Sequence, residues 1–172
     1  MTAPRRPALD VISHSPEQTL RIGTQLGRVL GQGSLVLLGG MIGAGKTTFA
    51  QGLARGLRVT TEMLSPTFTL VTEHDGTDAH ERAVRIYHID LYRIEEAEEV
   101  LSFGFEEYLD DQSAITIIEW PERARGLLPP EYIMIELATV ADTKRSITID
   151  PHGERYRLAI ETLRRELAGA RG

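Results

Sequence analysis

Hydrophobic and polar residues follow two different periods along this chain, and the changes of period mark the expected elements. Unbroken apolar runs at residues 34–38 and 114–118 are typical of strands buried on both faces of a sheet. Apolar residues that recur every fourth position predict a helix over residues 48–57. Strands and helices that alternate in this way predict an α/β fold.

The N-terminal region predicts one strand and one helix. A short strand is expected near residues 9–13. The sequence Ser-Pro-Glu at residues 15–17 combines an N-cap, a first-turn proline and an early acid, which is the pattern of a helix start. We expect this helix to include Val29 and Leu30 and to stop near residues 31–33.

The remaining pattern completes a mixed sheet. Asp75 and Gly76 have the composition of a turn, which would join a strand following residues 65–71 to a second strand at residues 83–90. Further elements are expected at residues 95–101 (an acidic helix), 105–109 (a shorter piece), 132–139 and 146–149 (strands), and in a terminal helix with Ile160, Leu163 and Leu167 on one face. This order predicts parallel strands at the centre of the sheet and antiparallel strands at its edges.

A glycine-rich segment between the first apolar run and the helix carries the clearest chemistry. Residues 40–47 read G-M-I-G-A-G-K-T and fit G-x-x-x-x-G-K-[ST] at every position. Small residues let backbone N–H groups turn inward around a di- or triphosphate, Lys46 reaches its β/γ oxygens, and the Thr47 hydroxyl ligates Mg²⁺. A plain glycine-rich turn has the same composition, but the strand before it and the helix after it favour a phosphate-binding loop. We therefore expect a three-layer sandwich of the P-loop NTPase type.

Two apolar strands end on a carboxylate, at Asp90 and Glu119. A P-loop only holds phosphates, and hydrolysis or transfer also needs Mg²⁺ support and a positioned nucleophile. Ligands of open α/β sheets bind beyond the carboxyl ends of the strands, which is where both acids are expected. Each acid alone is as typical of a solvated strand end or an N-cap as it is of a catalytic site. The two acids together, downstream of a P-loop, indicate a catalytic site.

Three other residues have two readings each. His88 is either a proton carrier or metal ligand, or a hydrogen-bonded structural histidine. Trp120 either stacks on a base or covers the core. Arg93 either acts as an internal arginine finger or forms a salt bridge to the acidic run at residues 95–99, which itself has the composition of a solvated helix face.

Length and composition narrow the class of protein. The 172 residues suit one domain, residues 1–172, with residues 1–8 as a flexible leader. No apolar run approaches the roughly 20 residues that span a bilayer, and the N-terminal arginines lack the apolar segment of a secretory signal. The absence of cysteine excludes disulfides, thiol nucleophiles and cysteine zinc sites, and it is compatible with a reducing cytoplasm.

Net charge argues against one class of ligand. The formal charge is −6, whereas proteins that hold a nucleic-acid backbone on their own are usually basic. We therefore do not expect the isolated chain to bind tRNA or DNA tightly.

Four motifs together resemble a known family. Residues 43–49, 65–71, 87–93 and 119–121 (GAGKTTF, SPTFTLV, YHIDLYR and EWP) occur in family order and at family-like spacing. The chain from about residue 15 to residue 130 is similar to the TsaE family, also called YjeE. These are bacterial P-loop ATPases of tRNA threonylcarbamoyladenosine biosynthesis.

The resemblance implies a function, partners and cofactors. It implies that the protein binds and hydrolyses ATP with Mg²⁺, and that hydrolysis drives cycling of a complex of TsaB and TsaD. TsaD transfers the threonylcarbamoyl group to adenosine 37 of tRNA, so contact with tRNA would be indirect, through the complex. The expected location is cytoplasmic, with no membrane association.

The resemblance also assigns residues by motif. Lys46 and Asp90 would be catalytic, with Asp90 polarising the attacking water or holding the metal through water. Thr47 and Glu119 would ligate Mg²⁺, and residues 65–67 would form a switch near the γ-phosphate. Nucleotide binding would fall to Pro16, Ile42, Gly43, Ala44, Gly45, Lys46, Thr47, Thr48 and Trp120. Met41 departs from the family, which often has an acid there, and this puts a side-chain role of that position in doubt.

Two other functions use the same motif. A small-molecule kinase would need an arginine-rich lid, for which residues 123–125 are the only short candidate. A nucleotide-dependent assembly switch without hydrolysis is the other, and the carboxylates Asp90 and Glu119 argue against it.

Overall fold

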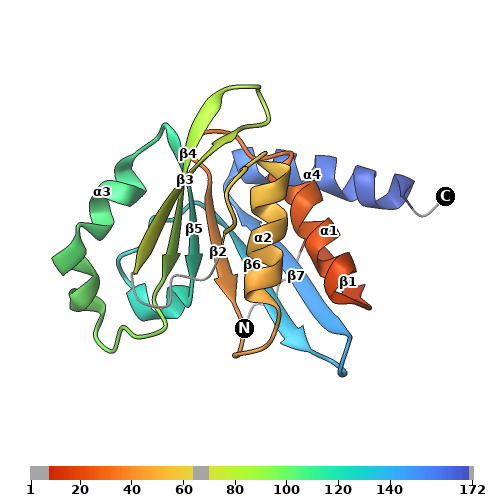
Figure 1. Ribbon diagram of the computed structural model, residues 1–172, viewed down its shortest axis with the longest axis horizontal. Coiled ribbons are helices and arrows are strands. Elements are labelled where there is room, and N and C mark those ends of the chain that lie inside the picture. The colour runs from red at the N-terminus through yellow and green to blue at the C-terminus, as the bar shows by residue number, and fades with distance from the viewer. Residues whose placement is uncertain (1–7, 64–69, 171–172) are drawn as a thin grey trace, which may run out of the picture.

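Within the described residues, 8–63 and 70–170, seven strands form one sheet in the order β1-β7-β6-β2-β5-β4-β3 (Figure 1). The structure is a computed structural model, and the expected leader falls almost wholly outside the described residues. The strands are Leu9–Ser13 (β1), Leu35–Gly39 (β2), Val71–Thr77 (β3), Ala83–Asp90 (β4), Ala114–Glu119 (β5), Tyr132–Thr139 (β6) and Arg145–His152 (β7). The helices are Pro16–Gly27 (α1), Lys46–Gly56 (α2), Phe105–Asp110 (α3) and Glu154–Gly169 (α4), with 3₁₀ segments at Ala97–Phe103 (η1) and Pro121–Ala124 (η2).

The sheet is parallel at its centre and antiparallel at both ends, as predicted. β2 pairs in parallel with β5 and β6, and β5 pairs in parallel with β4. β3 is added antiparallel at one end, and β7 and β1 at the other. Four parallel strands therefore end at one edge of the sheet, and Leu38, Glu119 and Asp90 lie side by side there in register.

Both faces of the central strands are covered by helices, which gives three layers (Figure 1). Val36 and Leu38 of β2 pack into the core cluster formed with α1, α2 and α4. Leu35 and Leu37 point to the opposite face and pack with residues of η1, α3 and η2. Every residue of β2 is buried, which explains its unbroken apolar run. The predicted three-layer α/β sandwich is confirmed.

Helices α1 and α2 touch backbone to backbone through glycines. A Cβ built on Gly52 would lie 2.3 Å from the carbonyl oxygen of Leu20 and 3.0 Å from the Cα of Gly23. A Cβ on Gly23 would lie 2.5 Å from the carbonyl oxygen of Phe49. Any side chain at this crossing would push the helices apart. The contact therefore fixes α1 against the helix that follows the glycine-rich loop.

The predicted end of the first helix is wrong. α1 ends at Gly27 rather than near residues 31–33. Beyond it, the N–H groups of Val29 and Leu30 donate to carbonyls three residues back, at 3.0 and 3.3 Å, so the chain tightens and turns toward β2. The Leu30 carbonyl accepts from the N–H of Ala79 at 2.9 Å. It is therefore bonded to the turn between β3 and β4 and not to a further turn of α1.

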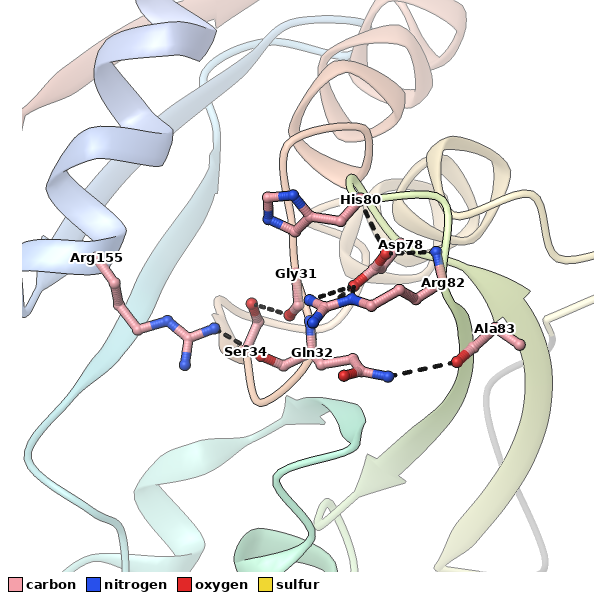
Figure 2. Close-up of polar contacts among 8 residues, drawn as sticks. All are labelled: Gly31, Gln32, Ser34, Asp78, His80, Arg82, Ala83 and Arg155. Carbon is pink, nitrogen blue, oxygen red and sulfur yellow. Dashed lines mark hydrogen bonds and ion pairs between the residues drawn. The ribbon is translucent and has the colours of Figure 1, made fainter.

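The predicted turn at Asp75 and Gly76 is also wrong, because both residues lie inside β3 and pair with β4. The turn falls at residues 78–82, and Asp78 organises it (Figure 2). Its buried carboxylate accepts from the N–H groups of Gln32, His80 and Arg82 and from the Arg82 guanidinium, at 2.8–3.1 Å. Turn propensity favoured Asp-Gly, but these bonds to a buried carboxylate determine where the chain reverses.

Two further elements differ in type or length from the expected ones. The acidic segment expected as a helix at residues 95–101 is the 3₁₀ segment η1, and β7 is longer than the strand expected at residues 146–149 because it pairs along all of β6. In the terminal helix, Ile160 and Leu163 are buried as predicted. None of the described helices has the length and apolar character that crossing a membrane requires.

Candidate functional site

The glycine-rich loop joins a buried strand to a helix, as the motif predicted. β2 ends at Gly39, residues 40–45 form the loop, and α2 begins at Lys46. Gly45 is the N-cap of α2 with φ of 102°, a left-handed conformation that favours glycine. The first N–H groups of α2 therefore open onto the end of the sheet where the parallel strands finish, which is a geometry suited to an anion.

A cavity of about 580 Å³ lies beside this loop. The residues that line it come from α1, the loop, the start of α2, the ends of β4 and β5 with the residues after them, the residue before β3, and the β6–β7 hairpin. They are Pro16, Thr19, Ile42, Gly43, Gly45, Lys46, Thr47, Thr48, Leu70, Asp90, Tyr92, Arg93, Glu119, Trp120, Asp142, Thr143 and Arg145. The structure thus brings the predicted site residues to one cavity, except Ala44, whose side chain is buried in the core.

Lys46 is buried, although it lies where the loop joins α2. Its relative exposure is 6%, because its side chain turns back over the loop. The ammonium donates to the carbonyls of Gly40 and Met41, the latter at 3.0 Å. It also lies 4.2 Å from the centre of the Trp120 ring, close enough for a cation–π contact. Lys46 therefore holds the loop together in addition to facing the cavity.

Carboxylates surround this buried cation. Burial lowers the pKa of Lys46, and the negative charges of Glu119, Glu122 and Asp90 oppose that shift. Burial also raises the pKa of Glu136, which lies in the middle of β6 and pairs with Gly39 at the end of β2. The cavity therefore has one buried cation at the loop and acidic groups around it.

Asp90 and Glu119 are direct neighbours at the ends of β4 and β5. Glu119 is 2% exposed, so it is not a solvated strand end. Its Oε2 lies 2.7 Å from Nε2 of His88, which is itself fully buried. Asp90 is half-buried and accepts from the N–H of Tyr92 at 2.9 Å. His88 thus forms the hydrogen bond expected of a structural histidine, and its partner is a candidate site residue.

Trp120 covers the core, which is one of its two predicted roles, and it also lines the cavity, while stacking on a base stays a prediction. Its backbone is left-handed, with φ of 59°, which is unusual for a residue other than glycine. The ring packs against the second core cluster, lies 5.2 Å from the Tyr92 ring, and lines the cavity over Lys46. Arg93 also lines the cavity, as an arginine finger would have to.

Several residues that line the cavity belong to none of the sequence motifs. Thr19 comes from α1, and Asp142, Thr143 and Arg145 come from the hairpin between β6 and β7. The Arg145 guanidinium donates to the Gly43 carbonyl at 3.2 Å, which ties this hairpin to the loop. No motif marks the hairpin residues, because they reach the cavity only through the parallel pairing of β6 with β2, which brings the turn after β6 to the same end of the sheet.

The expected switch and Met41 are the two other features that the sequence singled out. The expected switch at residues 65–67 lies outside the described residues. Met41 lies within the described residues and is 78% exposed, and its carbonyl accepts a hydrogen bond from the Lys46 ammonium. In the described structure this position therefore contributes its backbone to the loop.

Comparison with known proteins gives a consistent result. A family model described as "Threonylcarbamoyl adenosine biosynthesis protein TsaE" matches residues 13–147. The chain is similar to the tRNA threonylcarbamoyladenosine biosynthesis proteins TsaE of Treponema pallidum, with 39% identity over 80% of this chain and 97% of that protein, and of Bacillus subtilis, with 36% identity over 88% and 90%. A crystal structure of YdiB from Bacillus subtilis superposes with a TM-score of 0.75 at 31% identity, covering 92% of this chain and 95% of that one.

Proposed function

The chain belongs to the TsaE family of tRNA threonylcarbamoyladenosine biosynthesis proteins, and from that premise we propose that it is the Mg²⁺-dependent ATPase of this machinery. Its hydrolysis of ATP would drive cycling of the TsaB–TsaD complex. We also propose that residues 1–172 act as one domain in the cytoplasm and meet tRNA only through the complex. The observation that carries the proposal is the placement of Lys46, Asp90 and Glu119 around one cavity beside the P-loop.

Nucleotide binding is supported by the loop and the helix behind it. The first turn of α2 offers backbone N–H groups and the positive end of its dipole to a phosphate chain. Lys46 supplies the cation, and it would exchange the carbonyls of Gly40 and Met41 for phosphate oxygens. Thr48, Pro16 and Trp120 line the same cavity and would contact the rest of the nucleotide.

The donor atoms at the cavity fit Mg²⁺. Thr47 contributes a hydroxyl, and Glu119 and Asp90 contribute carboxylates, all hard oxygen ligands of the kind that Mg²⁺ prefers. The part of the chain that is described contains no group of three or more His, Cys, Asp or Glu residues arranged to hold a metal. That suits an ion shared with the nucleotide phosphates, which supply the other ligands. When bound, Mg²⁺ would neutralise charge that develops on the phosphate oxygens.

The protein's own groups would divide the remaining work. Glu119, buried and fixed at the end of β5, suits a ligand that must not move. Asp90 is half-buried, so it can reach a water molecule as well as the site, and we assign it to positioning the attacking water. Lys46 would stabilise negative charge on the β/γ oxygens as the bond to the leaving group breaks.

The test compares hydrolysis by the chain alone and with its proposed partners. Phosphate release from Mg-ATP is measured during a titration with TsaB–TsaD, and association is measured in parallel with ATP and with ADP. We expect a low rate alone, stimulation by the pair, and tighter association with ATP, because a nucleotide that favours the complex must itself bind more tightly there. Equal affinity with both nucleotides and an unchanged rate would refute the proposal. Transfer of phosphate to a sugar or nucleotide in place of water would instead support the kinase alternative.

A further inference from the structure

His88 and Glu119 form a buried pair next to the proposed metal ligand position. They lie on adjacent parallel strands, where His88 of β4 is in register with Ile117 of β5, two residues before Glu119. Alternation along both strands places the two side chains on the face covered by α1 and α2. There Nε2 of His88 meets Oε2 of Glu119 at 2.7 Å, with side-chain exposures of 0% and 3%.

The contact has a defined polarity. An ionised carboxylate only accepts hydrogen bonds, so Nε2 of His88 is the donor. The other ring nitrogen, Nδ1, is buried and has no hydrogen-bond partner among the described residues. A neutral imidazole with its proton on Nε2 satisfies this arrangement, because its single N–H is then used in the bond to Glu119. Among the described residues, the bond to Glu119 is therefore the one side-chain hydrogen bond that accounts for a buried histidine at this position.

We propose that His88 is a positioning residue for Glu119, an inference that rests on the proposed role of Glu119 as a Mg²⁺ ligand. By holding Oε2, the imidazole fixes the rotamer of the carboxylate and leaves its second oxygen for the cavity that Glu119 lines. A ligand held in one orientation by a neighbouring donor binds metal more tightly than one that must be ordered on binding. His88 itself does not line the cavity, so it acts through Glu119.

The test measures the Mg²⁺ concentration that half-saturates nucleotide binding. Trp120 is the only tryptophan of the chain and adjoins Glu119, so its fluorescence reports binding without requiring turnover. His88→Leu removes the donor, whereas His88→Gln keeps an N–H near the position of Nε2. We expect His88→Leu to require about 10-fold more Mg²⁺ or higher, and His88→Gln to recover most of the loss. Binding of nucleotide in EDTA should be the same in all variants.

Controls separate positioning from stability and from the proposed function. His80→Gln removes an exposed histidine in the turn between β3 and β4, at the other end of β4 from Asp90, and should leave the Mg²⁺ requirement unchanged. If His88→Leu does not fold, His88→Asn provides a shorter polar side chain whose N–H does not reach Glu119, and it should show the same increase. An unchanged Mg²⁺ requirement in folded His88→Leu or His88→Asn, with Glu119→Gln impaired, overturns the positioning role alone. An unchanged requirement in Glu119→Gln overturns both this role and the metal assignment.

Discussion

Replacing Gly52 with alanine tests whether the α1–α2 crossing holds the wall of the cavity in place. The added methyl group would lie 2.3 Å from the Leu20 carbonyl oxygen and 3.0 Å from the Cα of Gly23. Both are backbone atoms, so no side-chain rotation relieves the overlap and the helices must separate. Pro16 and Thr19, at the start of α1, line the cavity and would move with it.

The size of the effect follows from two opposing contributions. Overpacking of a tight interior contact typically costs about 1–3 kcal/mol. Alanine in place of glycine inside a helix returns roughly 1 kcal/mol. Since the clash is with backbone, we take the upper part of the first range and expect a net loss of about 1–2 kcal/mol in the free energy of unfolding. For a chain of this size, that corresponds to a fall of roughly 2–8 °C in Tm.

The assay is thermal unfolding together with the affinity for Mg-ATP. Gly169→Ala is the control, because this glycine also lies in a helix, as the last residue of α4, and a Cβ there meets nothing within 4 Å. We expect the control to keep or slightly raise Tm and to leave affinity unchanged, while Gly52→Ala lowers both. A Gly52→Ala protein as stable as Gly169→Ala would show that the helices can separate freely and that the crossing does not constrain α1.

Lys46→Ala should abolish the rise in Tm that Mg-ATP produces and should also lower the Tm of the free protein by the equivalent of about 1 kcal/mol, since it removes two bonds to loop carbonyls; an undiminished ligand-induced rise would contradict this. Glu119→Ala should raise the Mg²⁺ requirement for nucleotide binding, whereas Asp90→Ala should keep binding and lose roughly 100-fold in hydrolysis with TsaB–TsaD present, as measured by phosphate release. Asp78→Asn should cost about 3 kcal/mol at pH 7, measured by urea unfolding, because it leaves backbone N–H groups facing an amide. Burial acts to raise the pKa of Asp78, but the hydrogen bonds from Arg82, His80 and Gln32 outweigh it and lower the pKa, so this stability is present above the unfolded pKa near 4 and is lost as the pH falls below it; a cost that stays constant down to pH 3 would refute the assignment.

Local sequence patterns predicted most of the fold because the central strands are apolar on both faces. β6 was predicted with its observed bounds, and β5 to within one residue. The errors fell where a distant contact overrides local propensity. α1 stops early because Leu30 pairs with Ala79, and the hairpin turns at Asp78 because Gln32, far away in the sequence, contributes a hydrogen bond.

The candidate site divides in the same way. The P-loop and the two strand-end acids are visible in the sequence, because each is a short motif with its own chemistry. The β6–β7 hairpin with Arg145 cannot be assigned to the site from the sequence, because its place at the cavity depends on β6 lying beside β2 in the sheet. The burial of Lys46 is not visible either, because it depends on the Trp120 ring reaching over from the end of β5.

The contacts of Lys46 would connect the proposed nucleotide binding to the shape of the loop at residues 40–45. Its ammonium bonds to Gly40 and Met41, while Arg145 bonds to Gly43, so two cations from different elements hold carbonyls of one loop. A phosphate that attracts Lys46 must compete with those carbonyls, and the loop is then free to adjust. Because Met41 presents an exposed side chain at the same position, any such adjustment would move a surface residue that a partner can contact. In the proposed function, where Lys46 binds phosphate, the state of the nucleotide would therefore be reported at the surface through Met41.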